Sequence, residues 1–147
     1  MFEDRLREGL ESLKRMKSPL IVNHYDCDGI CSGSLVRKGL LKMGKTCENR
    51  TFRALDEEVL ASLKGEKEMV FVDFGASMSE RIEELMPDAK VVIIDHHQAK
   101  DSKILQVNPF VFGIDGGKEL SSSSTAYLVF HDPSLADLAI VGSVGDM

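Results

Sequence analysis

Acidic and imidazole side chains stand at the ends of three apolar segments of the chain. The acids are Asp26, Asp28, Asp73 and Asp95, and the histidines are His24, His96 and His97. Gathered in one place, such carboxylates repel one another and lose solvation unless cations neutralise them. Carboxylate oxygens with some imidazole suit Mn²⁺ or Mg²⁺ better than a structural zinc site, which prefers thiolates. The residue types therefore predict a centre for divalent cations.

The chemistry that such a centre supports is phosphoester hydrolysis. Two divalent ions about 3.5–4 Å apart activate a water and stabilise the charge of an in-line transition state. Gly29 follows Asp28 at a predicted helix start, where backbone N–H groups also suit a phosphate. The simpler alternative is that Asp and His gather at strand ends because loops are polar. The spaced pair Asp26 and Asp28 and the tandem pair His96 and His97 favour a site.

The elements that must position these residues alternate between strands and helices. Apolar runs predict strands at 20–23, 46–52, 69–73 and 91–94, with an edge strand or two within 103–112. Helical spacing predicts helices over 3–17, 31–44, 56–65 and 77–87, and from 121 onward with a break near 133. This order predicts an α/β fold, in which a mostly parallel sheet is flanked by helices on both faces.

Two local expectations follow from this sheet. Ligand sites of parallel sheets form outside the carboxyl ends of the strands, so three strands would deliver carboxylates to one rim. Asp26 and Asp28 are two residues apart, and in an extended stretch they are expected to point to the same side. Ser77 and Glu80 have the spacing of a capping box at the start of their helix.

Length and composition predict one soluble domain. The 147 residues suffice for one core, and 43% hydrophobic with 29% charged residues is typical of globular proteins. No apolar run reaches the roughly 18 residues of a membrane span, and a secretory signal is missing, so we expect a cytoplasmic protein without membrane contact. The net charge of −6 argues against a generic basic nucleic-acid binder, unless metal ions hold several of the acids. The three cysteines are expected to be reduced, buried thiols.

Four motifs, in order, resemble those of the DHH phosphoesterase superfamily. They are NHYDCDGICSG (23–33), VDFG (72–75), DHH (95–97) and VGSVGD (141–146). The match covers residues 20–146 and implies the Rossmann-like, three-layer fold of a DHH catalytic domain. Within the superfamily, FGIDGGKELSSSSTAYLV (112–129) resembles the archaeal RecJ-like nucleases and their GINS-associated replication-fork relatives.

The resemblance implies a role for each motif residue. The metal ligands would form two sets with one bridging residue, namely His24 with Asp26, Asp28 with His96 and Asp146, and Asp73 between the two ions. His97 would lie beside the scissile phosphate, and Asp95 would orient a histidine. His97, Asp95 and Asp73 are thus the predicted catalytic residues, and the cofactor is two Mn²⁺ or Mg²⁺ ions.

The function implied is that of a two-metal phosphodiesterase, a RecJ-like exonuclease on single-stranded DNA or RNA. One alternative keeps the chemistry and changes the substrate to short oligonucleotides, cyclic dinucleotides or pyrophosphate. Another is a non-catalytic replisome module with a GINS-type partner. The retained acids argue against this module. RecJ-like relatives also carry a C-terminal DHH-associated, substrate-binding domain, of which the sequence has no trace. Residues 1–147 are therefore expected to form a single catalytic domain, with the second domain either in a longer protein or on another chain, and its activity in isolation is left open.

Some residues outside the motifs are candidates for substrate contact. Basic residues after the first motif either follow a nucleic-acid backbone or form a solvated face; they are Lys38, Lys42, Lys45, Arg50 and Arg53. The run Ser121–Ser124 either contacts phosphate or caps a helix. Phe110 and Phe112 either stack a base or, as alternating aromatics more often do, join the core. The substrate-binding candidates are Ser124, Arg50 and Arg53.

Overall fold

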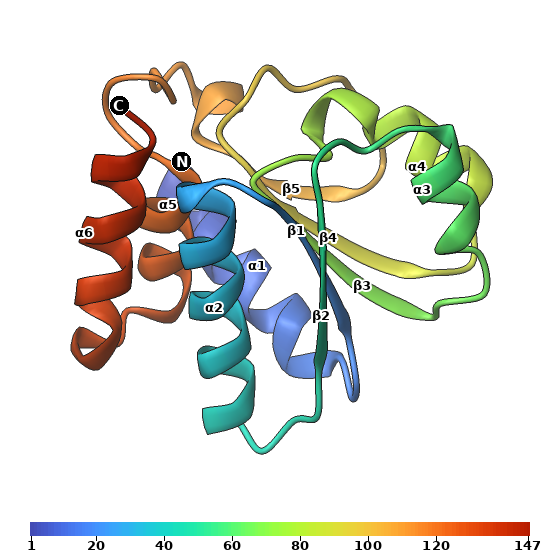
Figure 1. Ribbon diagram of the computed structural model, residues 1–147, viewed down its shortest axis with the longest axis horizontal. Coiled ribbons are helices and arrows are strands. Elements are labelled where there is room, and N and C mark those ends of the chain that lie inside the picture. The colour runs from blue at the N-terminus through green and yellow to red at the C-terminus, as the bar shows by residue number, and fades with distance from the viewer.

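Five parallel strands form one sheet in the order β2-β1-β3-β4-β5 in the computed structural model, which describes residues 1–147 (Figure 1). The strands are β1 (Leu20–His24), β2 (Glu48–Phe52), β3 (Glu68–Val72), β4 (Lys90–Ile94) and β5 (Leu105–Val107). Parallel sheets are covered on both faces, which explains the continuous apolar runs of the central strands. The edge strand β2 is mostly polar and partly exposed. The predicted α/β fold is confirmed.

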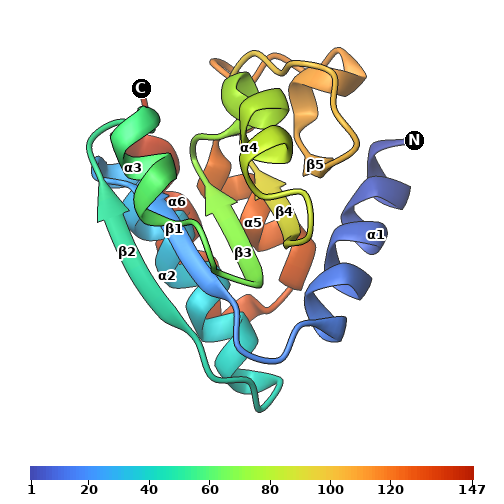
Figure 2. The same cartoon turned by 90° about the vertical axis from the view of Figure 1, so that its right-hand side faces the viewer.

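Helices cover both faces of the sheet. On one face lie α1 (Phe2–Arg15), α2 (Cys27–Lys42), α5 (Ser122–Phe130) and α6 (Ala136–Gly145), and on the other lie α3 (Glu57–Ser62) and α4 (Ser79–Leu85) (Figures 1 and 2). Three short 3₁₀ helices complete the chain, at Ala76–Met78, Pro109–Phe112 and Pro133–Leu135. None of the helices has both the length and the apolar content that a membrane span requires.

Successive residues of the central strands pack into two separate hydrophobic cores. In β3, Val70 and Val72 belong to the larger cluster beneath α1, α2 and α5, whereas Met69 and Phe71 belong to the smaller cluster beneath α3 and α4. Side chains of a strand alternate between its two faces, so each strand serves both layers. With both faces filled, the carboxyl ends of the strands remain as the place for polar residues.

The register of the sheet aligns the ends of three strands. Asn23 of β1 pairs with Val72 of β3, and Val72 pairs with Ile94 of β4. The residues one step further along the three strands are therefore neighbours: His24, Asp73 and Asp95. This is the rim that the sequence predicted.

Helix α2 starts in tight contact with the end of β1. Asp26 is its N-cap and accepts a hydrogen bond from the N–H of Gly29 at 2.8 Å. A Cβ atom on Gly29 would lie 2.4 Å from the carbonyl oxygen of His24, so only glycine permits this approach. The close contact brings the first turn of α2 to the rim.

Several local predictions are wrong. The Ser77–Glu80 capping box does not form, because the chain enters α4 through a 3₁₀ turn that contains Ser77, and α4 begins at Ser79 without a side-chain cap. Pro109 starts another 3₁₀ helix directly after β5, so Phe110 and Phe112 leave the sheet and are 45% and 36% exposed. All three cysteines are free thiols as expected, but only Cys31 is buried, Cys27 being exposed and Cys47 half-buried.

Candidate metal centre

The rim at the carboxyl ends of β1, β3 and β4 collects all six predicted metal ligands. Their donor atoms form two groups, each with every atom within 4.8 Å of the others: His24, Asp26 and Asp73, and Asp28, His96 and Asp146. Asp73 also belongs to a third such group, with His96 and His97. The two groups are those that the motif resemblance implied, and Asp73 lies between them. Their role as metal ligands stays a prediction.

Asp73 is the most constrained residue of the rim. Its φ angle of 64° lies in the left-handed region, which non-glycine residues adopt rarely and which recurs at functional sites. Its Oδ2 atom lies 3.3 Å from Nδ1 of His24, and its Oδ1 atom lies 3.4 Å from Nε2 of His96. Burial raises the pKa of Asp73 to about 6, and the nearby carboxylate of Asp28 adds to the increase. This carboxyl group therefore occupies the centre of the rim at an energetic cost.

Asp28 is fully buried, and backbone groups of a distant helix hold it. Its two carboxylate oxygens accept hydrogen bonds from the N–H of Ser122 at 2.8 Å and the N–H of Ser123 at 2.9 Å. Asp28 lies in the first turn of α2, so the expectation that it extends beside Asp26 is wrong. The chain turns into the helix at Asp26, and the two acids consequently belong to different groups.

His96 has one engaged ring nitrogen and one without a partner. Its Nδ1 atom lies 2.8 Å from the carbonyl oxygen of Gly116, and its buried Nε2 atom has no hydrogen-bond partner. Burial lowers the pKa of His96, but the interactions with Asp73, Gly116 and Asp146 outweigh it and raise the pKa to about 9. A histidine that donates Nδ1–H to a carbonyl group presents Nε2 as a lone-pair donor once it is neutral, which is how histidines bind metals.

His97 is held by a buried acid. Oδ1 of Asp95 lies 2.7 Å from Nδ1 of His97, and Oδ2 accepts a hydrogen bond from the N–H of Ala76 at 3.0 Å. The hydrogen bond that His97 donates to Asp95 raises the pKa of His97. Although burial favours the neutral acid, the contacts from His97 and from backbone N–H groups lower the pKa of Asp95. The His97 ring is thereby fixed while its side chain stays 54% exposed.

The acids of the rim have no lysine or arginine partner. Every ion pair that Asp26, Asp28, Asp73, Asp95 and Asp146 make is with a histidine. Buried charges are normally paired or bind metals. Two buried atoms, Asp73 Oδ1 and His96 Nε2, also lack any hydrogen-bond partner. The oxygen-rich donor set and these two orphaned atoms fit divalent cations of the Mn²⁺ or Mg²⁺ type.

A cavity of about 370 Å³ opens beside the rim. It is lined by His24, Arg53, Ala54, Leu55, Asp73, Phe74, Gly75, Ser77, Met78, Asp95 and His97. Arg53 is its only cationic side chain apart from the histidines, and the guanidinium carbon lies 5.9 Å from the centre of the Tyr25 ring. The cavity thus combines a cation, an apolar wall and the exposed side of His97.

The other substrate-binding candidates lie outside this cavity. Arg50 pairs with Glu66 at 3.0 Å. Lys42 bonds to Asp132 and Ser134, and Lys45 donates to the last carbonyl groups near the end of α1. The Ser124 hydroxyl lies 2.7 Å from that of Ser143. Substrate contact by Arg50, Arg53 and Ser124 stays a prediction, and of the three the structure places only Arg53 in the cavity.

The serine run caps helix α5. Ser121 is the N-cap and accepts a hydrogen bond from the N–H of Ser124, while the next two N–H groups, of Ser122 and Ser123, go to Asp28. The first backbone donors of the helix are therefore used inside the protein. A helix cap was one of the two alternatives that the sequence left open for this run. The hydrogen bonds to Asp28 were not predicted, and their only signal was a serine run between the third and fourth motifs.

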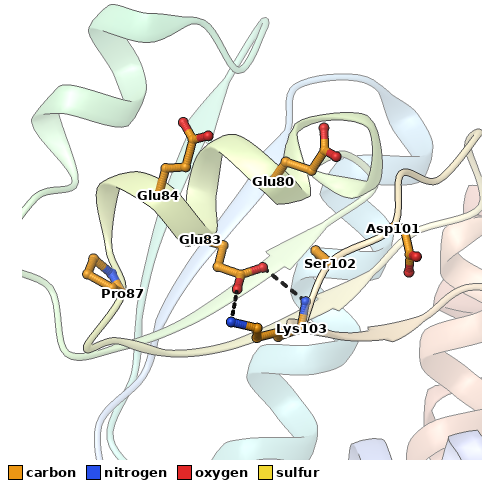
Figure 3. A pocket seen from close by; sticks show the side chains of 7 residues that line it. All are labelled: Glu80, Glu83, Glu84, Pro87, Asp101, Ser102 and Lys103. Carbon is orange, nitrogen blue, oxygen red and sulfur yellow. Dashed lines mark hydrogen bonds and ion pairs between the residues drawn. The ribbon is translucent and has the colours of Figure 1, made fainter.

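The surface has a second, larger acidic region, the α4 hollow, with a volume of about 820 Å³ (Figure 3). It is lined by Glu80, Glu83, Glu84, Pro87, Asp101, Ser102 and Lys103. Glu83 accepts a hydrogen bond from the Lys103 N–H at 3.0 Å and pairs with its Nζ atom at 3.5 Å. The hollow contains no histidine, and its acids lie on α4 and the loop before β5, away from the rim.

Comparison with known proteins identifies relatives in sequence. The model described as "DHH family, N-terminal domain" matches residues 19–142. The uncharacterized protein MJ0831 of Methanocaldococcus jannaschii is 36% identical over 141 residues, which cover 86% of this chain and 32% of that protein. The chain thus spans about a third of the length of this curated relative.

Solved structures share the fold at lower identity. The exonuclease RecJ bound to manganese superposes with a TM-score of 0.79 at 22% identity, over 99% of this chain and 43% of that one. RecJ from Thermus thermophilus in complex with Mn²⁺ superposes with a TM-score of 0.75 at 22% identity, over 99% of this chain and 24% of that one. CDC45 from Entamoeba histolytica superposes with a TM-score of 0.68 at 17% identity, over 98% of this chain and 32% of that one. At these identities the likeness establishes the fold.

Proposed function

The chain belongs to the DHH family, and on this premise we propose that it is a two-metal phosphodiesterase of the RecJ-like type, acting on single-stranded nucleic acid from an end. One observation carries the proposal. Asp73 Oδ1 and His96 Nε2 lie 3.4 Å apart, buried and without hydrogen-bond partners, among acids that no lysine or arginine neutralises. Metal ions would supply both the missing positive charge and the missing partners.

The two groups of donor atoms would each hold one ion. His24 and Asp26 would bind the first, and Asp28, His96 and Asp146 the second, with Asp73 contacting both. When bound, such ions supply an activated water and stabilise the charge of the phosphoryl transition state. The shared role of Asp73 is supported by its two oxygens, one of which faces each group.

Other side chains would act on the substrate. Asp95 fixes His97 through Nδ1, which leaves Nε2–H of the protonated ring to donate to an oxygen of the scissile phosphate or of the leaving group. Arg53 would pair with a neighbouring phosphate, and Leu55 and Phe74 would provide an apolar wall for a base. The cavity volume of about 370 Å³ is of the size class of small-ligand sites, which suits the terminal nucleotide of a strand.

The same site would also serve short oligonucleotides, and the fold shared with CDC45 keeps a replisome module as the non-enzymatic alternative. Competition between short oligonucleotides and long single strands distinguishes the two substrates. A groove for long strands binds longer strands more tightly, whereas a closed nucleotide site does not. The full set of potential ligands argues against the module, because an interaction surface gains nothing from buried carboxylates that have no lysine or arginine partner.

The direct test is release of mononucleotides from end-labelled single-stranded DNA and RNA by the full chain in Mn²⁺. We expect cleavage that requires the metal and is lost in Asp73→Ala. Glu83→Ala, in the α4 hollow, is the matched control and should retain the parent rate. No cleavage of any single strand in Mn²⁺ or Mg²⁺ by the intact protein would refute the proposal.

A further inference from the structure

Tyr25 is a half-exposed aromatic residue at the rim. It stands between His24 and Asp26 in the chain, and both of these residues belong to the first group of proposed ligands. The Tyr25 ring packs against the His24 ring, with the ring centres 5.0 Å apart and the ring planes at 86°. Tyr25 is nevertheless 51% exposed. The ring is thus held at the edge of the metal centre, with part of its surface open to solvent.

The second feature is the guanidinium group of Arg53, which lies beside this ring. Its central carbon is 5.9 Å from the centre of the Tyr25 ring, within the range of a cation–π contact. Arg53 makes no ion pair, whereas Arg50 of β2 pairs with Glu66 at 3.0 Å. Arg53 lines the cavity beside the rim, and Tyr25 does not. The cation is therefore available to an anion in the cavity, and the ring lies next to it outside the cavity.

The register of the sheet brings the ring and the cation together. His24, the last residue of β1, pairs with Phe52, the last residue of β2. Tyr25 and Arg53 are the next residues after these two, so the sheet itself places them side by side. Their closeness therefore follows from the same parallel register that assembles the rim.

An aromatic ring beside an unpaired guanidinium group matches the two parts of a nucleotide. Bases stack on aromatic side chains with little regard to sequence, because every base has a π face. Guanidinium groups bind phosphate through charge-assisted hydrogen bonds. Pyrophosphate and other base-free phosphates would use the cation and leave the ring without a ligand. The pair therefore favours a substrate that carries bases.

We propose that Tyr25 stacks on a base of the substrate and that the site consequently selects nucleotide chains over base-free phosphates. This inference rests on the proposed function and deepens it by naming what the substrate must carry. Leu55 and Phe74 wall the cavity that would take the terminal nucleotide, whereas Tyr25 lies outside that cavity, beside Arg53. The base that stacks on Tyr25 is accordingly that of the next nucleotide along the strand.

Phe112 provides a matched control at the other side of the sheet. Its ring also has an arginine beside it, with the guanidinium carbon of Arg5 at 5.7 Å, and it is 36% exposed. Phe112 follows the edge strand β5 and packs against Phe2 of α1, whereas Arg53 follows the opposite edge strand, β2. Truncation of either ring removes an aromatic contact with an arginine, and only Tyr25→Ala removes one at the rim.

The experiment is steady-state cleavage by the full chain in Mn²⁺ of two single strands of equal length, one intact and one with abasic residues near both ends. We expect Tyr25→Ala to raise KM for the intact strand by about 5–100-fold, the loss of one stacked base, with little change in kcat. The parent should show a similar increase on the abasic strand, and Tyr25→Ala should add nothing to it. Tyr25→Phe, which retains the ring, should restore the low KM, and Phe112→Ala should behave as the parent on both strands.

Four results would overturn the inference and leave the two-metal function standing. The first is a parental KM for the intact strand in Tyr25→Ala. The second is an equal loss on the intact and abasic strands, which would mean that the ring only holds Arg53 or His24 in place. The third is a Tyr25→Phe variant that binds as weakly as Tyr25→Ala, and the fourth is the same base-dependent loss in Phe112→Ala. No cleavage of either strand by the parent in Mn²⁺ or Mg²⁺ would instead overturn the proposed function together with the inference.

Discussion

Acidic residues gather in two regions of the molecule, the rim and the α4 hollow, which differ in the burial and the partners of these acids. The rim buries Asp28, Asp73 and Asp95 almost completely and pairs them only with histidines and backbone N–H groups. The α4 hollow keeps its glutamates near solvent, where Glu83 pairs with Lys103 and Glu80 with Lys100. Exposed acids with lysine partners need nothing further, whereas buried acids without them need a cation.

The volumes of the two regions do not follow their chemistry. The hollow, at about 820 Å³, is more than twice the volume of the cavity beside the rim, at about 370 Å³. Only the smaller cavity is lined by histidines and by an aspartate with a left-handed backbone, Asp73, whose buried Oδ1 atom has no hydrogen-bond partner. Burial, backbone strain and missing partners therefore distinguish the rim from the hollow, and the number of acids or the volume does not.

The largest expected difference between the two regions is in activity. Asp28→Ala removes a buried carboxylate and leaves the N–H groups of Ser122 and Ser123 without an acceptor, so we expect cleavage to fall by about 10³-fold or more. Glu80→Ala, in the α4 hollow, should cleave at the parent rate. The measurement is single-turnover cleavage of labelled single strands, and an equal loss in both variants would erase the distinction.

A smaller effect is expected from the arginines. Arg53→Ala removes the cation of the cavity and should raise KM by about 10–100-fold, with little change in kcat. This fold-change corresponds to the free energy of one hydrogen bond to a charged group. Arg50→Ala breaks a surface pair with Glu66 and should leave both constants unchanged. If the steady-state rates give the reverse pattern, substrate enters from the other side of β2.

The rim should also couple metal binding to pH, which the hollow cannot do. Without metal the pKa of His96 is raised to about 9, so at pH 7 its ring holds a proton that a metal must displace. Mn²⁺ affinity should accordingly rise by up to about tenfold per pH unit from 7 and level off above 9. Calorimetry in two buffers of different ionisation enthalpy measures the released proton; equal heats at pH 7 would argue against His96 as a ligand.

The smallest effect is expected in the hollow itself. Glu83→Gln removes a half-exposed partner of Lys103 and should lower the free energy of unfolding by at most about 1 kcal/mol, as for other surface pairs. Its Mn²⁺ affinity should equal that of the parent. Chemical denaturation measures the first quantity, and a loss well above that limit would mean that the hollow is a stabilised site in its own right.

The fold and the members of the rim could be predicted from the sequence because both depend on local patterns. Apolar runs and helical spacing fix the order of the elements, and parallel strands place their carboxyl ends together, so His24, Asp73 and Asp95 become neighbours. The Asp73 position follows from the register alone. Its left-handed backbone does not, because no local pattern marks it.

What could not be predicted depends on contacts between distant segments. Asp28 bonds to N–H groups 94 and 95 residues away, and nothing in its own motif indicates them. The exposure of Phe110 depends on where Pro109 ends the sheet, and the partner of Arg50 depends on how β2 packs. The residues that gather at the rim are therefore predictable from local patterns, whereas the contacts that hold them depend on the tertiary structure.

The most direct test of the account is a crystal structure of the full chain in Mn²⁺, with the ions located by anomalous scattering. Two peaks are expected at the rim, about 3.5–4 Å apart, with Asp73 in contact with both ions and no peak in the α4 hollow. An empty rim, or Mn²⁺ bound only among the glutamates of the hollow, would contradict it.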